Sequence, residues 1–521
     1  MLKSLRWAVA CAIVLAALIA GTAAEGSNPP LWIKHIQNYD GGISNGVRAR
    51  LAASEVRVNG FIAAATATLQ NVQMNADSDP PLPQNETSVA YKPSNPMIAV
   101  AASNDYVGDG DWIGNTRDGG QTWASTFKDP KTSLGTRCFG GDPSVVYSAR
   151  DRAFYLATLC FFGAGESELQ VLRSTDDGAT WTDSTKASLV RTNRLGDGWD
   201  QTVFYDKELL AVDNNPRSSH YGRLYMTYIK FHMTMPNGRS DYCPVQAAYT
   251  DRIPHDATAA SWTNVAVVAD DPAGDGRGAG ANQWALPVVD STGALDIAYT
   301  LEDCNSGFDR GFFFTRSTNG GATFSPAVQI DKAGQFADNP NTGDKLNPKK
   351  FRAPISPALA FNPTTGSLNF VYQNNLNRQT SGADISFQQS RNFGATWSDA
   401  KTISTTAGGA AAPNDQFFPW LSVDEAGNMH AIWFDNRNDP NNTMMETFQA
   451  FSSDDGSTWR NWDISSASWN PDDAFFGCGC FIGDYNAIAA STQVVYPVWT
   501  DGRNGGGQTD IFTNVEVGGI R

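Results

Sequence analysis

Ser174-Thr-Asp-Asp-Gly-Ala-Thr-Trp181 is one of five copies of an eight-residue pattern. The other copies are Thr116-Arg-Asp-Gly-Gly-Gln-Thr-Trp123, Ser317-Thr-Asn-Gly-Gly-Ala-Thr-Phe324, Ser390-Arg-Asn-Phe-Gly-Ala-Thr-Trp397 and Ser452-Ser-Asp-Asp-Gly-Ser-Thr-Trp459. Short Asp, Asn, Ser and Thr side chains bond nearby backbone N–H groups, and Gly adopts the positive φ that a tight turn needs. The pattern therefore predicts a structural turn between two strands, and the aromatic residue opens the second strand.

This pattern resembles the Asp-box, or bacterial neuraminidase repeat, of the sialidase-like superfamily. Asn replaces Asp in two copies, and Phe324 replaces Trp in one. The resemblance implies an all-β fold, namely a β-propeller of four-stranded antiparallel blades in which the repeated turn joins the third strand to the fourth. It does not by itself imply sialidase activity, because unrelated functions share one scaffold.

The spacing of the repeated turns favours seven blades. Seven pairs of apolar strands recur along the chain, and the gap between the turns at 174 and 317 is about twice the others, so we assign it to a blade that has lost its turn. After Trp499 only one further strand follows, at 510–517. We therefore expect a propeller domain at 86–521 that is closed by a strand from an N-terminal extension, residues 25–85. The alternative is six blades, as in sialidases, with one pair outside the ring.

The start of the chain resembles a secretory signal. Lys3 and Arg6 precede an apolar run from Trp7 to Ala20, and small residues follow up to Ala24. We expect residues 1–24 to be removed and the mature protein to be secreted, either extracellular or periplasmic.

Six cysteines remain after this segment, and an even number in an exported chain favours disulfides. We expect the pairs Cys138–Cys160 and Cys243–Cys304, whereas Cys478 and Cys480 could pair with each other or reach elsewhere. None of the five histidines lies beside that last pair in sequence, so we expect no metal site there.

Charge and hydropathy limit the kinds of partner that we expect the protein to bind. The formal net charge of −16 disfavours nucleic acid and anionic membranes, and no later stretch is apolar enough to span a bilayer. We expect a monomer that binds a glycan or glycoconjugate and needs no cofactor. The Asp-rich stretch from Asp105 to Asp111 could hold structural Ca²⁺, but solvated turns explain it better, because nothing matches an EF-hand.

Antiparallel strands place the loops between blades at the end opposite the repeated turns, and this end collects the candidate site. The sialidase resemblance implies a Tyr nucleophile with a Glu partner, an acid/base Asp and three arginines that bind a sugar carboxylate. Our candidates are Tyr485 as nucleophile, Glu302 as its partner and Asp142 as acid/base, with Asp105 as the alternative for Asp142. For the carboxylate we select Arg352, Arg437 and Arg503.

These residues support two functions. One is a secreted sialidase-like glycoside hydrolase that acts on terminal acidic sugars. The other is a propeller that binds glycan or protein at the same end without catalysis. Arg437 and Arg503 belong to the repeated motif Asp-x-Arg-Asn, which could equally be a structural brace in which Asp and Arg pair with each other.

Overall fold

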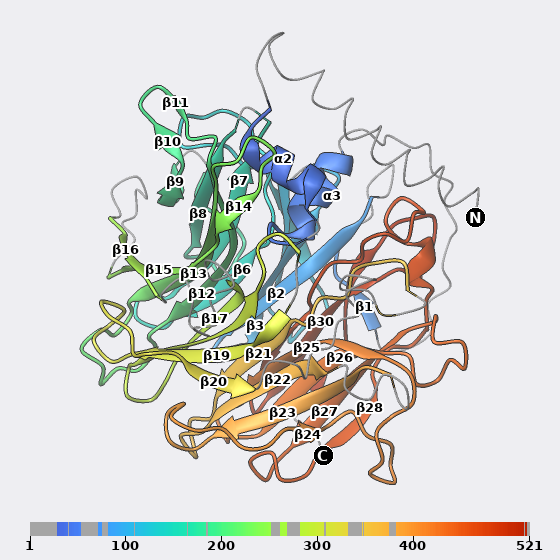
Figure 1. Cartoon of the computed structure of the whole chain (residues 1–521). Helices are drawn as coiled ribbons and strands as arrows, with labels where there is room; N and C mark the ends of the chain where they lie inside the picture. The colour runs from blue at the N-terminus through green and yellow to red at the C-terminus, as the bar shows by residue number, and fades with distance from the viewer. Residues whose placement is uncertain are drawn as a thin grey trace.

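Seven antiparallel sheets form the body of the molecule, and a separate two-stranded sheet is attached to it. The computed structural model describes residues 29–39, 41–53, 71–75, 82–108, 110–163, 165–183, 186–251, 261–267, 282–306, 309–331, 346, 349–374, 382–514 and 516–517. Each of the seven sheets forms a four-stranded blade, and the blades are arranged as a β-propeller (Figure 1). The predicted all-β propeller of seven blades is confirmed. The expected signal segment, residues 1–24, lies outside the described residues, and the proposed domain limits stay predictions.

In six blades the strands follow one another in chain order from the first to the fourth, whereas in the seventh the fourth strand is β1 (Asn71–Gln73), which comes first in the chain. The first strands are β2 (Gln84–Lys92), β6 (Ser144–Ser148), β12 (Val203–Val212), β17 (Asn282–Val289), β21 (Pro357–Phe361), β25 (Gln416–Val423) and β29 (Ala487–Ala490). The second strands are β3 (Asn95–Asp105), β7 (Ala153–Phe161), β13 (Leu224–Met233), β18 (Leu295–Glu302), β22 (Leu368–Asn374), β26 (Met429–Asp435) and β30 (Val494–Asp501).

The outer half of each blade is shorter. The third strands are β4 (Gly110–Thr116), β8 (Ser167–Ser174), β15 (Val245–Thr250), β19 (Asp309–Ser317), β23 (Asp384–Ser390), β27 (Glu446–Ser452) and β31 (Asp510–Asn514). The fourth strands are β5 (Ala124–Lys128), β9 (Ser188–Thr192), β16 (Thr263–Ala266), β20 (Val328–Asp331), β24 (Lys401–Thr402), β28 (Arg460–Asp463) and β1 (Asn71–Gln73). Additional short elements are β10 (Arg194–Leu195), β11 (Gly198–Trp199), β14 (Ser240–Tyr242), β32 (Glu516–Val517), α2 (Leu31–Asn38), α3 (Asn45–Ala53) and the 3-10 turn η3 (Pro471–Asp473).

Strand β1 closes the ring. It pairs antiparallel with β31, with Val72 opposite Thr513, and Figure 1 shows it among the C-terminal strands. The seventh blade is thereby completed by the N-terminal part of the chain, as predicted. Since β1 covers the outer side of β31, that strand presents no open edge.

The five repeated turns join third to fourth strands through the predicted side-chain bonds. In the second, fourth and fifth blades, however, the aromatic residue lies before the fourth strand and does not open it. In the second blade Gly178 N–H donates to Ser174 Oγ at 3.0 Å, Thr180 N–H donates to Asp176 Oδ1 at 2.9 Å, and Trp181 Nε1 donates to the Gly178 carbonyl. The glycine has φ +85°, and its α-carbon faces Val100 of the preceding blade. Each turn therefore connects two strands and also packs against the neighbouring blade.

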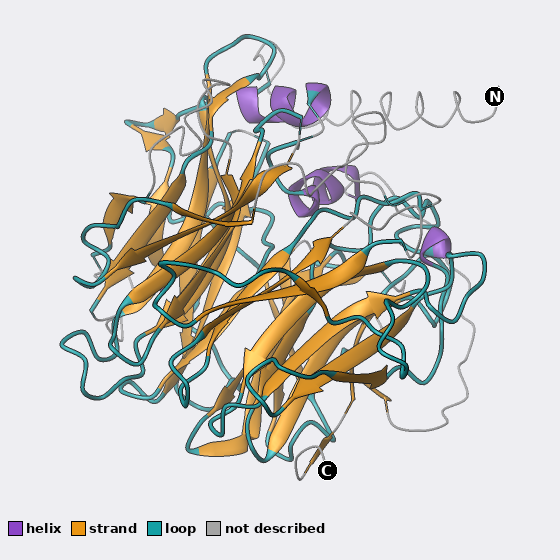
Figure 2. Ribbon diagram, turned by 60° about the horizontal axis from the view of Figure 1, so that its bottom comes forward, coloured by secondary structure: helices purple, strands orange, loops and turns teal. Residues whose placement is uncertain are grey.

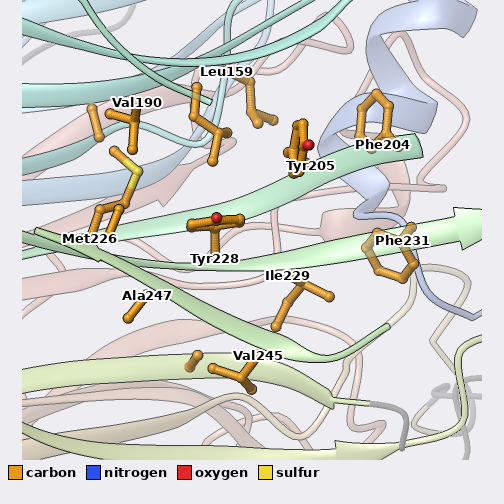
Figure 3. Close-up of a cluster of buried hydrophobic side chains, with 14 of the residues drawn as sticks. Leu159, Val190, Phe204, Tyr205, Met226, Tyr228, Ile229, Phe231, Val245 and Ala247 are labelled. Carbon is orange, nitrogen blue, oxygen red and sulfur yellow. The ribbon is translucent and has the colours of Figure 1, made fainter. Parts of the chain in front are cut away.

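The hydrophobic core lies between neighbouring blades. Figure 3 shows one such region, where Leu159 and Val190 of the second blade meet Tyr205 and Tyr228 of the third. The two tyrosine rings pack edge to face, with centroids 5.8 Å apart. The blade that lacks the repeated turn therefore also contributes to the hydrophobic core.

Disulfides join loops at the end opposite the repeated turns. Cys138 pairs with Cys160 and Cys243 with Cys304, as predicted, and Cys478 pairs locally with Cys480. The two helices gather at one end of the strands (Figure 2). No helix among the described residues is long and apolar enough to cross a membrane.

Candidate functional site

Bulges in the first strands position the central residues of the site. The pairing of first with second strands shifts register in four blades, and one of these shifts in each blade contains Glu86, Lys207, Trp284 or Phe418. All four have positive φ, between 52° and 60°. A non-glycine residue in this conformation costs of order 1–3 kcal/mol, and a bulge re-aims its side chain. The surrounding structure therefore imposes these conformations.

Lys207 is the centre of this arrangement. Its Nζ lies 3.3 Å from Asp142 Oδ2 and 3.8 Å from Glu86 Oε1. The same nitrogen lies 4.4 Å from the ring centroid of Trp284 and 3.9 Å from that of Tyr485. Burial opposes the charged form, but the carboxylates outweigh it and raise the pKa of Lys207. Lys207 is therefore a buried ammonium enclosed by two acids and two aromatic rings.

The two acids next to Lys207 have pKa values that are displaced in opposite directions. Burial raises the pKa of Glu86 well above its ordinary value, and the charge of Asp142 adds to this effect. Burial acts on Asp142 in the same sense, but Lys207 outweighs it and the pKa of Asp142 is lowered. Burial therefore favours the protonated form of Glu86, whereas Lys207 favours the ionised form of Asp142.

Asn104 and the backbone fix this pair. Asn104 Nδ2 donates to Glu86 Oε2, while Asn104 Oδ1 accepts the backbone N–H of Asp142 at 2.7 Å. The N–H of Asp484 donates to Glu86 Oε1 at 3.2 Å. One amide side chain thus aligns both acids, which makes the pair a built feature of the site.

Further acids surround the pair. Burial raises the pKa of Asp206 and of Asp111 to about 7 each, and it raises that of Glu208 well above its ordinary range. Neither carboxyl oxygen of Glu208 accepts a hydrogen bond from another described residue. Among the described residues no group of three or more His, Cys, Asp or Glu side chains is arranged to hold a metal ion. The cluster is therefore an acidic centre of buried carboxyl groups around one lysine.

Two predicted catalytic residues, Tyr485 and Asp142, lie in this centre. Burial raises the pKa of Tyr485 well above its ordinary value, and Asp142, Glu86 and Glu208 raise it further. Trp284 and Trp420 contact the ring of Tyr485, with centroids 5.9 and 6.1 Å away. Tyr485 is therefore part of an aromatic wall beside the acids.

Glu302 ends the second strand of the fourth blade, where it is buried opposite position 309 of β19. Asp105, the alternative to Asp142, ends the second strand of the first blade, and its Oδ1 accepts the N–H of Val107.

The three predicted arginines bind carboxylates of the protein itself. Arg437 Nη2 contacts Asp435 Oδ2 at 2.6 Å, and Arg503 Nη2 contacts Asp501 Oδ2 at 2.6 Å. Each guanidinium also lies over a phenylalanine of its own third strand, 4.1 Å and 4.4 Å from the ring centroid. These are the contacts of a structural brace, made independently in two blades.

Arg352 differs from the other two, because its carboxylate partner belongs to the site. Its Nη2 lies 3.2 Å from Asp484 Oδ2, and Asp484 adjoins Glu86 and Tyr485. Arg352 is therefore the predicted arginine that borders the acidic centre.

Glu86 and Lys207 were missed as functional candidates from the sequence. Lys207 stands in the inter-blade stretch Asp206-Lys207-Glu208, where a lysine between two acids is an available signal. Glu86 carries no comparable motif, since the bulges and the N-terminal part of the chain bring it to the centre.

Comparisons with known proteins concern the fold. No family model matches the chain, and no curated protein matches it. A protein of unknown function from Dyadobacter fermentans is similar over 72% of this chain and 94% of its own, at 12% identity and TM-score 0.45. A Hadza microbial sialidase is similar over 81% of this chain and 73% of its own, at 12% identity and TM-score 0.43. The α-L-arabinofuranosidase of Fusarium graminearum is similar over 86% and 98%, at 12% identity and TM-score 0.43.

Proposed function

We propose that the protein is a secreted glycoside hydrolase whose catalytic carboxyl pair is Glu86 and Asp142. The observation that carries the proposal is the buried arrangement of this pair, in which Asn104 holds both acids and Lys207 Nζ lies 3.3 Å from Asp142 and 3.8 Å from Glu86, with the pKa of Glu86 raised and that of Asp142 lowered. Two carboxyl groups with separated pKa values, one protonated and one ionised, are what glycoside hydrolysis requires. Three disulfides are consistent with an oxidising compartment outside the cell.

In the proposed reaction each acid has its own role. Glu86 donates its proton to the glycosidic oxygen as the bond to the anomeric carbon breaks. The Asp142 carboxylate attacks that carbon and holds the sugar as a covalent intermediate. The Glu86 carboxylate then accepts a proton from a water whose oxygen displaces Asp142, so that both acids return to their starting forms; this two-step course suits carboxyl groups about 5 Å apart. Lys207 stabilises the ionised form of Asp142 between turnovers.

The charges of the centre favour a neutral sugar. Its two cations, Lys207 and Arg352, already contact Asp142 with Glu86 and Asp484, respectively. A substrate carboxylate would have to displace these partners in an acidic environment. A neutral sugar could instead place its apolar face on Trp284 and Tyr485.

A sialidase-like hydrolase of terminal acidic sugars is the second candidate. The position of Tyr485 beside Asp142 favours it, because the resemblance implies a Tyr nucleophile near an acid/base Asp. In that scheme Glu302 would assist Tyr485, and Arg352, Arg437 and Arg503 would have to exchange their present carboxylates for that of the sugar. The raised pKa of Tyr485 also opposes its activation as a nucleophile.

A panel of fluorogenic glycosides distinguishes the candidates. Release of fluorophore from a neutral furanoside or pyranoside, lost in Asp142→Asn and retained in Tyr485→Phe, supports the first. Release from a sialic-acid glycoside, lost in Tyr485→Phe, supports the second. If none of the glycosides is cleaved while immobilised glycans are retained by the protein, both hydrolase proposals fail and binding without catalysis is favoured.

A further inference from the structure

The N-terminal segment formed by residues 41–53 lies directly on the acidic centre. The backbone N–H of Ser44 donates to Asp206 Oδ2, and Gln283 Nε2 donates to the carbonyl of Gly42. Asp206 and Gln283 belong to the first strands of the third and fourth blades. Main-chain groups of this segment thus bond polar side chains that line the centre.

Gly46 in α3 lies over the acid pair itself. A Cβ at this position would be 2.7 Å from Asp142 Oδ1 and 2.7 Å from Glu86 Oε2. The two oxygens are thus at most twice that distance apart, and the backbone of Gly46 lies next to both. A sugar could not contact both acids while Gly46 holds this position.

Arg50 attaches α3 to the first blade. Its Nη1 donates to the Asp105 carbonyl at 2.6 Å, Nη2 donates to the Gly110 carbonyl, and the guanidinium lies 4.7 Å from the ring centroid of Tyr106. The side chain is 1% exposed. Ala49 and this tyrosine belong to one buried hydrophobic cluster. The anchor is thus a single buried arginine that bonds two backbone carbonyls.

We propose that residues 41–53 are an intramolecular inhibitor that must leave the acidic centre before substrate reaches Glu86 and Asp142. This inference rests on the proposed hydrolase. The segment precedes β1, which closes the ring, so its departure leaves the pairing of β1 with β31 in place. The position of Gly46 over both acids carries the proposal, because it covers the atoms that would react.

Two variants loosen the segment by independent means. Gly46→Ala introduces a methyl group against two carboxyl oxygens, and Arg50→Ala removes the anchor. Gln37→Ala, at an exposed position of α2, is the matched control. Overpacking of this kind costs about 1–3 kcal/mol, so we expect hydrogen exchange of residues 41–53 in Gly46→Ala to rise about 10- to 100-fold. Exchange of residues 71–75 should not change, which would show that the ring stays closed.

Access to the centre is measured without reference to activity. Carbodiimide coupling of glycinamide, read by peptide mass spectrometry, reports whether Glu86 and Asp142 can be reached. We expect little coupling in the wild type and in Gln37→Ala, and at least about tenfold more in Gly46→Ala and Arg50→Ala. Turnover of the responsive glycoside should rise in parallel.

The outcomes separate this inference from the proposed function. Raised exchange with unchanged coupling overturns the inhibitor, because the segment would then not restrict access. Equal turnover by the wild type and both loosened variants overturns it too. If coupling rises but no glycoside is cleaved, residues 41–53 do cover the acidic centre. The proposal of a hydrolase is then refuted, and so is the inhibitory role of the segment. If residues 71–75 lose exchange protection in Gly46→Ala, that variant has opened the ring and is set aside. The coupling and turnover of Arg50→Ala then test the inhibitor by themselves.

Discussion

Gly456→Ala tests whether the repeated turns also join the blades. Gly456 has φ +80°, and a Cβ there would lie 2.5 Å from two ring carbons of Phe387 in the preceding blade. The left-handed backbone costs a non-glycine residue about 1–2 kcal/mol, and overpacking adds about 1–3 kcal/mol. We expect the free energy of unfolding to fall by about 2–5 kcal/mol in total.

Gly409→Ala is the matched control. Gly409 has φ +81°, and nothing lies within 4 Å of its added Cβ, so only the backbone term of about 1–2 kcal/mol applies. Urea titrations followed by tryptophan fluorescence give both values. In a Phe387→Ala background, which removes the ring, the cost of Gly456→Ala should fall toward that of Gly409→Ala. Equal losses for the two alanine variants in the wild-type background would refute the proposed contact between blades.

Three further predictions concern stability. Lys207→Met leaves buried acids without their counter-charge and should lower the free energy of unfolding by about 3–5 kcal/mol in a urea titration. The control is Lys350→Met, which removes an exposed ion pair with Asp472 and should change that free energy by less than about 1 kcal/mol. Burial and the charge of Arg48 lower the pKa of His35 to about 4. The stability that neutral His35 gives the folded state is therefore complete above about 6.5, its pKa in the unfolded chain, and is lost as the pH falls toward 4. Hydrogen exchange of α2 should therefore report a loss of about 2 kcal/mol between pH 8 and 5, absent in His35→Gln, and an identical pH dependence in that variant would contradict the assignment. Removing the disulfide Cys243–Cys304, whose cysteines are 61 residues apart, should lower the free energy of unfolding by about 4 kcal/mol. Removing Cys138–Cys160, whose cysteines are 22 residues apart, should lower it by about 3 kcal/mol. Thermal unfolding measures both losses, and a larger loss for Cys138–Cys160 would contradict the loop-entropy argument.

The architecture could be predicted because it depends on short-range chemistry. In the turn at Ser174 to Trp181 the bonding groups lie within five residues, so the pattern determines the turn, and its spacing indicates the blades. The closing strand and two disulfides followed from counting strands and cysteines. None of these inferences required knowledge of the direction in which a side chain points.

The site was predictable only in part, because convergence at the axis is a non-local property. Tyr485 and Asp142 were found from their inter-blade loops, which topology brings to one end. Glu86 and Lys207 reach the centre through bulges that no motif marks. The motif at Arg437 and Arg503 is the same whether the guanidinium binds a ligand or the Asp two residues before it. Which of the two it binds depends on how the backbone leaves the end of the second strand.

The central claim is that Glu86 and Asp142 are the two catalytic carboxyl groups of a hydrolase, and kcat/KM in the Gly46→Ala background tests it most directly. Positioned acids and bases contribute about 10²–10⁴-fold to rate, so Asp142→Asn and Glu86→Gln should each lower kcat/KM for the responsive glycoside by at least about 100-fold. Tyr485→Phe, which preserves the ring, should lower it by less than about tenfold. Undiminished turnover in Asp142→Asn and Glu86→Gln would contradict the account.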